Sequence, residues 1–227
     1  MKILLSGGSG TLGSELVKLV ENTGHEIFFP TSKCMDVTDI NEIKKNIEQC
    51  SPDVFIHASA FTDVKACEIE LEKSIDVNII GTCNVVKACN EHNLRLVHIS
   101  TDYVFDGEKG SYTIHDPINP ITKYAKSKAA AELSVRMYNK SLVIRTSFYG
   151  KTFPYDKAVT DQWTTKDYVD IIAPMILREV VSSRLGIVHC MSKKRTIYEI
   201  AKDRKPTVTP VLRKELSILV PKDTSLI

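Results

Sequence analysis

Apolar positions in the first 150 residues follow two alternating patterns. Short continuous apolar runs, typical of buried strands, are separated by segments with apolar residues at helical spacing. The expected strands are 2–6, 26–29, 53–58, 95–100 and 142–145, and the expected helices are 11–21, 39–49, 72–93 and 121–138. Because parallel strands are joined by crossover helices, this alternation predicts an α/β fold with a doubly wound parallel sheet, of the Rossmann type.

The pattern weakens after Gly150. A polar stretch broken by Pro154 comes first, and a helix expected over 167–181 contains Pro174, which should kink or divide it. A short strand is expected over 186–190, followed by a helix that Ser192 could cap. We therefore expect one large domain over 1–150 and a small, shortened C-terminal region over 151–227.

Composition and charge exclude several classes of protein. Thirty basic and 28 acidic residues leave a net charge of +2, which gives no case for a nucleic-acid or membrane partner. The six cysteines form no C-x-x-C pair and have no matching histidine cluster, so we expect reduced thiols, no metal site and a cytoplasmic location. The chain opens directly into a strand, without the pattern of a signal peptide, and no apolar run is long enough to span a bilayer.

A glycine-rich turn joins the first expected strand to the first expected helix. It has the spacing Gly7-x-x-Gly10-x-x-Gly13, with Thr11 and Leu12 inside it. In such turns the glycines allow a tight bend, close approach of the backbone to a pyrophosphate, and close packing of helix on strand. The helix start then presents N–H groups to the phosphates, which makes 1–150 the predicted NAD(P)-binding domain.

The segment after the second strand bears on the choice of cofactor. The acidic residue that usually binds the ribose diol is missing, and Thr31, Ser32 and Lys33 stand there instead. Two hydroxyls and an ammonium suit a 2′-phosphate, so NADPH is favoured and NADH is left open; alternatively, Lys33 simply points to solvent. Asp36, next to Val37, could accept a hydrogen bond from the adenine amino group, unless this stretch only caps the next helix.

Three further side chains suit carbonyl reduction. Tyr124 and Lys128 are four residues apart and so share one helix face, and Thr101 stands at a strand end. A free phenol has a pKa of about 10, and a neighbouring ammonium should lower it. We expect Tyr124 to donate the proton, Lys128 to lower the pKa of the phenol and hold the nicotinamide ribose, and Thr101 to orient the substrate oxygen.

With these elements the chain resembles the extended short-chain dehydrogenase/reductases, and more specifically the dTDP-4-dehydrorhamnose reductase family. The matching strings are 52–54 with 57–64, 100–107, 117–120 ahead of Tyr124, and 144–148. The resemblance implies an NAD(P)H-dependent reductase of a nucleotide-diphospho-4-keto-6-deoxy sugar, with Thr101, Tyr124 and Lys128 as the catalytic set. It further implies that Ala58, Ser59 and Ala60 line the cofactor groove and that the sugar is faced by Thr62, Val64, Thr101, Asp102, Tyr103 and Phe148.

The chain departs from this family in three places. The stretch from Gly150 to Asp161 is short, the chain stops soon after Leu226, and His57, interpreted as a packed core residue, stands where asparagine is common. The regulatory subunit of methionine adenosyltransferase resembles this fold without catalysis, so a non-catalytic NAD(P)-binding subunit is the alternative. A reductase or dehydratase of a different nucleotide sugar also stays open, as does a homodimer.

Overall fold

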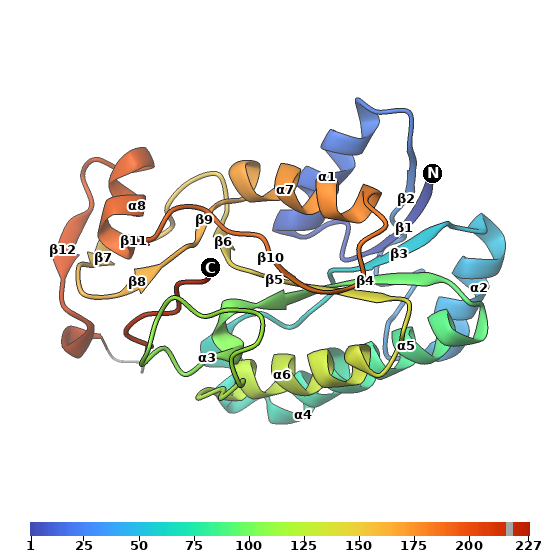
Figure 1. Cartoon of the computed structure of the whole chain (residues 1–227), viewed down its shortest axis with the longest axis horizontal. Helices are drawn as coiled ribbons and strands as arrows, with labels where there is room; N and C mark the ends of the chain where they lie inside the picture. The colour runs from blue at the N-terminus through green and yellow to red at the C-terminus, as the bar shows by residue number, and fades with distance from the viewer. Residues whose placement is uncertain (217–219) are drawn as a thin grey trace.

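The computed structural model describes residues 1–216 and 220–227, and its centre is a six-stranded sheet (Figure 1). All neighbouring strands run parallel, in the order β10-β5-β4-β3-β1-β2. The strands are β1 (Lys2–Ser6), β2 (Glu26–Phe28), β3 (Val54–His57), β4 (Arg95–Thr101), β5 (Ser141–Thr146) and β10 (Gly186–His189). The expected doubly wound α/β fold is confirmed, and its strand order reverses direction between β1 and β3.

Helices cover both faces of this sheet. Figure 1 shows α1 (Thr11–Glu21) and α7 (Val169–Val181) on one face, and α5 (Gly81–Glu91) and α6 (Lys123–Arg136) on the other. The helix α2 (Ile40–Cys50) packs against α5. Each face buries an apolar cluster, the first centred on Ile3, Leu16 and Ile172, the second on Phe55, Val85 and Leu96.

The long helix expected over 72–93 is present, and it contains a π-helical segment. It runs through α4 (Leu71–Ser74), the π-helix η1 (Ile75–Ile80) and α5 without a gap, and the short helix α3 (Val64–Ile69) precedes it. Such π-helical turns are uncommon and often stand at functional sites. The apolar spacing predicted the helix but not the change of helix type inside it.

The C-terminal region builds a second, smaller core from short strands and one helix. Its elements are β6 (Phe148–Tyr149), β7 (Lys157–Val159), β8 (Trp163–Thr164), β9 (Asp167–Tyr168), β11 (Arg195–Thr196), α8 (Ile197–Arg204) and β12 (Thr209–Val211). Its buried apolar residues include Phe153, Tyr168, Ile197 and Ile200. The helix α8 is capped by Thr196, with Glu199 completing a capping box, and not by Ser192 as expected.

The division at residue 150 is less simple than the sequence suggests. Both α7, with Pro174 inside it, and β10 lie beyond residue 150 but join the layers of the large sheet. The chain end also returns to the large domain, where Tyr112 and Leu226 form a parallel bridge. The short helices η2 (Asp102–Val104) and η3 (Arg213–Glu215) complete the described elements.

Candidate functional site

The glycine turn lies at the carboxyl end of β1, beside the reversal point of the strand order. Gly7 has a φ of +78°, and a Cβ there would lie 2.8 Å from the backbone carbon of Ala58. A Cβ on Gly13 would lie 2.1 Å from the carbonyl oxygen of Gly7. Both positions therefore require glycine, and the turn packs directly on Ala58 and Ser59, which follow β3.

The start of α1 suits a bound phosphate. Gly10 is the N-cap of this helix, no side chain caps the helix, and its first turn has no acidic residue. Thr11 is exposed there, whereas Leu12 is buried. Uncapped backbone N–H groups and the helix dipole together favour an anion, so this turn fits the pyrophosphate of a dinucleotide.

The predicted recognition loop after β2 is exposed. Ser32 and Lys33 both lie at the surface. The Oδ1 atom of Asp36 accepts hydrogen bonds from the N–H and the hydroxyl of Thr38, both at 2.9 Å. Val37 is buried, and a Cβ on Gly81 would lie 2.8 Å from its Cγ2. Ser32 and Lys33 are thus free to meet a ligand, while Asp36 and Val37 also have structural contacts.

Thr101 is the last residue of β4, and two hydrogen bonds orient its hydroxyl. The hydroxyl donates to Oδ1 of Asp102 at 3.2 Å and accepts the backbone N–H of Tyr103 at 3.2 Å. Its backbone pairs with Thr146 in β5. The hydroxyl therefore has a defined place at the carboxyl edge of the sheet, where α/β folds bind ligands.

Tyr124 lies in the first turn of α6, and Thr122 caps this helix by accepting the N–H of Ala125. The ring of Tyr124 is partly exposed and meets the ring of Tyr103 edge-on, with 6.4 Å between the centroids. Burial and the carboxylate of Asp102 raise the pKa of the Tyr124 phenol, and the nearby Thr101 hydroxyl opposes this shift. The phenol is therefore protonated at neutral pH, as a proton donor must be.

Lys128 lies one turn further along α6, and its ammonium points into the protein. The Nζ atom donates to the carbonyl oxygen of Ile99 at 2.9 Å and lies 3.5 Å from Nε2 of His98. Burial lowers the pKa of Lys128 to about 8, and the charge of Glu132 opposes this shift. The expectation that Lys128 lowers the pKa of Tyr124 is not met, because the ammonium is bound to β4 and the phenol is desolvated.

Two buried histidines lie behind Lys128. The ring of His57 contacts Ser6 at 2.8 Å through Nδ1 and Thr82 at 3.0 Å through Nε2. Since the Thr82 hydroxyl donates to the carbonyl oxygen of Asn78, Nε2 of His57 carries the proton. Burial lowers the pKa of His57 to about 3 and that of His98 well below its usual value, with Lys128 adding to both shifts. His57 is thus the packed core residue that we expected.

Asn78 is a positioning residue that the sequence reasoning missed. Its side chain accepts the N–H of Phe61 at 2.7 Å and donates to the carbonyl oxygen of Phe61 at 3.0 Å. It also donates to the hydroxyl of Ser127, which in turn donates to the carbonyl oxygen of Tyr124. The π-helix η1 therefore ties the loop after β3 to the helix that carries Tyr124 and Lys128.

The residues expected to face a sugar separate into two groups. Thr62 is exposed and Val64 and Tyr103 are partly exposed, so these three can meet a ligand. Asp102 is 1% exposed, and its carboxylate accepts hydrogen bonds from Thr101 and, at 2.8 Å, from Thr224. It therefore does not face a sugar as expected, but ties the end of β4 to the C-terminal segment.

Phe148 is partly exposed and packs against the apolar cluster under α1 and α7, so its contact with a sugar stays a prediction. The next residue, Tyr149, shares a cationic neighbour with Tyr103. The ammonium of Lys166 is 4.6 Å from the centre of the Tyr149 ring and 5.7 Å from that of Tyr103. Sequence reasoning missed Tyr149 and Lys166, because no motif contains them.

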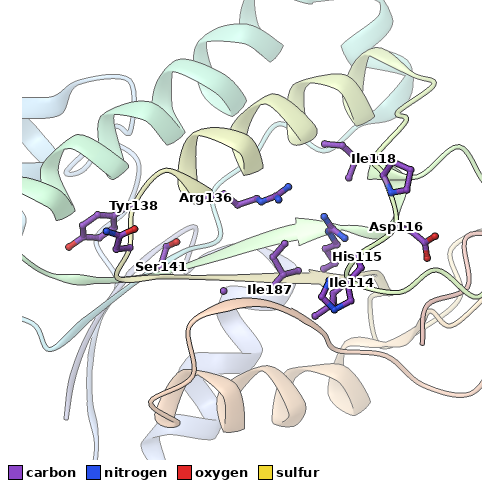
Figure 2. Close-up of a pocket in the computed structure, with 12 residues that line it drawn as sticks. Ile114, His115, Asp116, Ile118, Arg136, Tyr138, Ser141 and Ile187 are labelled. Atoms are coloured by element: carbon purple, nitrogen blue, oxygen red, sulfur yellow. The ribbon is translucent and has the colours of Figure 1, made fainter.

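A separate pocket of about 800 Å³ lies between α6, β5 and β10 (Figure 2). It is lined by polar residues such as Arg136 and Ser141, by Ile187, and by the loop 114–118. It shares no residue with the predicted site. In the described part of the chain, no three metal-ligating side chains gather and no helix could span a membrane.

Comparisons with known proteins agree with this geometry. Residues 1–203 match the family described as the RmlD substrate binding domain. This chain belongs to that family. The spore coat polysaccharide biosynthesis protein SpsK of Bacillus subtilis (strain 168) is 39% identical to it over 206 residues, which are 83% of this chain and 72% of that protein. The dTDP-4-dehydrorhamnose reductase of Aggregatibacter actinomycetemcomitans is 35% identical over 182 residues, which are 77% of this chain but only 61% of that protein.

Solved structures extend the likeness of this RmlD-family chain to the whole fold. The dTDP-4-dehydrorhamnose reductase of Bacillus anthracis (strain Ames), solved in complex with NADP, matches with a TM-score of 0.91 and 28% identity, over 100% of this chain and 90% of that one. The dTDP-4-dehydrorhamnose reductase of Clostridium acetobutylicum matches with a TM-score of 0.90 and 30% identity, over the same shares. The fold and the family predicted from the sequence are therefore confirmed.

Proposed function

We propose that this protein reduces the ketone of a nucleotide-diphospho-4-keto-6-deoxy sugar with NADPH. One observation carries the proposal: Thr101 and Tyr124 lie together at the carboxyl edge of the sheet that also holds an uncapped glycine turn. RmlD-family membership supports the substrate class, and the NADP complex of the Bacillus anthracis relative supports the cofactor. The alternative, a non-catalytic NAD(P)-binding subunit, is not favoured.

The cofactor is assigned to residues that fit it. In this proposal, Gly7, Gly10 and Gly13 form the turn for the pyrophosphate, and the exposed side chains of Ser32 and Lys33 bind a 2′-phosphate. Bound NADPH supplies the hydride. In this proposal, Lys128 turns from the carbonyl oxygen of Ile99 to hold the nicotinamide ribose.

The remaining step is proton transfer to the substrate oxygen. Tyr124 donates this proton, because burial keeps its phenol protonated at neutral pH. Thr101 donates a hydrogen bond to the same oxygen and orients it. To donate this hydrogen bond, the Thr101 hydroxyl rotates and gives up its hydrogen bond to Asp102. That bond is weak, because its donor–acceptor distance is 3.2 Å.

A direct assay tests the proposal. Purified protein with NADPH is given a panel of nucleotide-diphospho-4-keto-6-deoxy sugars, and absorbance of the reduced nicotinamide is followed. Oxidation that depends on one sugar supports the proposal and names the substrate. NADPH binding without oxidation by any sugar contradicts it and favours the non-catalytic alternative. A homodimer and a cytoplasmic location remain predictions, which light scattering and cell fractionation test.

A further inference from the structure

The pocket between α6, β5 and β10 has the size and lining of a ligand site, and the proposed reduction does not use it. Its volume of about 800 Å³ is typical of pockets that bind small molecules. Ile114 and Ile118 from the loop and Ile187 from β10 are partly exposed and give the pocket apolar walls. In Figure 2, Arg136 extends from α6 toward the loop, and Ile187 lies on the other side of the same space.

The guanidinium of Arg136 is an available cation in the lining of this pocket. Its side chain is 42% exposed, and its Nη1 atom lies 3.8 Å from Oε1 of Glu132, which is too far for a hydrogen bond. Among the described residues, no acceptor lies within hydrogen-bond distance of this guanidinium. Its N–H donors can therefore bind an anion in the bidentate way that is typical of arginine.

Glu132 does not neutralise Arg136, because Arg145 already occupies this carboxylate. The Nε and Nη2 atoms of Arg145 donate to its two oxygens at 3.1 and 2.6 Å, and the Ser100 hydroxyl donates to one of them at 2.8 Å. Glu132 is 0% exposed and Arg145 is 1% exposed, so the pair is a fixed part of the core. One carboxylate thus meets two guanidiniums, which leaves one positive charge at the pocket.

Arg145 provides a second, independent indication of an anion. It lines the pocket, and its Nη1 atom is buried without a hydrogen-bond partner among the described residues. Buried donors without acceptors are rare and costly. Asp116, the acidic residue in the lining, does not compensate this donor, because its carboxylate is bound by the Lys109 ammonium at 2.5 Å and by Thr113 at 2.7 and 2.9 Å.

We propose that this pocket binds an organic anion, with the carboxylate or phosphate group on Arg136 and the apolar part against the three isoleucines. The planar fork of a guanidinium pairs with either oxyanion through two parallel hydrogen bonds. The apolar walls add affinity that a small inorganic ion cannot use. Because the pocket shares no residue with the proposed reductase site, it is a second ligand site and does not depend on the proposed function.

Four probes separate the two parts of this ligand. Phenyl phosphate and benzoate carry an oxyanion on an aromatic ring, inorganic phosphate has the charge alone, and benzyl alcohol has the ring without a charge. Each probe is titrated into isotope-labelled protein in the presence of NADP, and the amide signals of Ile114, Ile118 and Ile187 are followed by NMR. We expect phenyl phosphate or benzoate to bind at least about tenfold more tightly than inorganic phosphate and benzyl alcohol. The tighter of the two shows whether the natural ligand is a phosphate ester or a carboxylic acid.

Three variants test the role of the guanidinium. Arg136→Gln removes the charge, Arg136→Lys keeps the charge without the fork, and Lys126→Gln is the matched control at an exposed position on α6 outside the pocket. Arg136→Gln should weaken the preferred anion at least about tenfold and leave benzyl alcohol unchanged, since a charge-assisted contact is lost. Arg136→Lys should lie between Arg136→Gln and the unmodified protein, and Lys126→Gln should bind normally. Thermal melting verifies that each variant is folded.

Three outcomes would overturn the inference. The first is that neither organic anion shifts the three isoleucine signals. The second is that inorganic phosphate binds as tightly as both organic anions, which indicates an adventitious ion only. The third is that the preferred anion binds folded Arg136→Gln and Arg136→Lys as tightly as the unmodified protein. None of these measurements involves turnover of a sugar, so failure of the proposed reduction leaves the result unaffected.

Discussion

The two ends of the candidate cofactor groove differ in how firmly their residues are held. At the catalytic end, defined here as Thr101, Tyr124 and Lys128, each residue lies in or beside β4 and α6 and has contacts to both. At the recognition end, defined as Ser32 and Lys33, the side chains are exposed on a loop. Chemistry requires groups fixed before the substrate arrives, whereas recognition of a charged phosphate tolerates a loop that adjusts.

The largest effect is expected at the catalytic end. Tyr124→Phe removes the proton donor but keeps the ring that meets Tyr103. We expect kcat to fall by about 10²–10⁴-fold, the usual contribution of general acid catalysis, with the affinity for NADPH unchanged. Stopped-flow or steady-state turnover together with NADPH titration measures both. Full turnover by this variant would remove Tyr124 from the mechanism.

The glycine turn connects the two ends, and Gly13→Ala tests how rigid it is. The added Cβ would lie 2.1 Å from the backbone oxygen of Gly7, so the turn must shift. We expect a loss of about 3 kcal/mol in the free energy of unfolding, at the upper end for overpacking, and much weaker NADPH binding. Gly24→Ala is the matched control, because its Cβ meets nothing within 4 Å. Equal melting temperatures for the two variants would contradict a steric requirement at Gly13.

The pKa of Lys128 predicts how activity depends on pH. Its pKa is lowered to about 8, so the ammonium is present below this pH and is lost as the pH rises through it. If the charged form holds the cofactor, kcat/KM should fall up to about tenfold per pH unit above pH 8. Burial of Lys128 also affects folding. Between about pH 8 and 10.5 this lysine is protonated in the unfolded state but not in the folded one, so the free energy of unfolding should rise with pH there. A pH profile that is flat up to pH 10 would contradict this role.

A smaller effect is expected at the recognition end. Lys33→Ala removes an exposed cation and no described structural contact, so stability should not change. We expect NADPH to bind about tenfold more weakly while NADH binding stays the same, since only NADPH has the 2′-phosphate. Fluorescence titration of both cofactors measures this difference. An equal loss for both would show that Lys33 supports the loop and does not recognise the phosphate.

Local patterns in the sequence predicted more of the candidate site than its tertiary contacts, for physical reasons. The glycine spacing and the four-residue interval from Tyr124 to Lys128 are local patterns. They were therefore enough to predict the turn after β1 and the helix face that Tyr124 and Lys128 share. The inward direction of Lys128 and the burial of Asp102 depend on partners far along the chain, Ile99 and Thr224. Asn78 and Lys166 were missed for the same reason, because tertiary contacts alone bring them to the site.

His57 is buried behind the catalytic end, and its titration should affect stability in acid. Its pKa is lowered to about 3, so the unfolded state binds the extra proton between about pH 6.5 and 3, and stability is lost as the pH falls through this range. One such group contributes a slope of at most about 1.4 kcal/mol per pH unit. His57→Asn removes this titration and keeps a polar side chain between Ser6 and Thr82, so urea unfolding at pH 7 and pH 5 should differ less in the variant than in the unmodified protein. Identical pH dependence in the two proteins would contradict a role of His57 in the loss of stability in acid. His98, whose pKa is also lowered by burial, would then account for that loss.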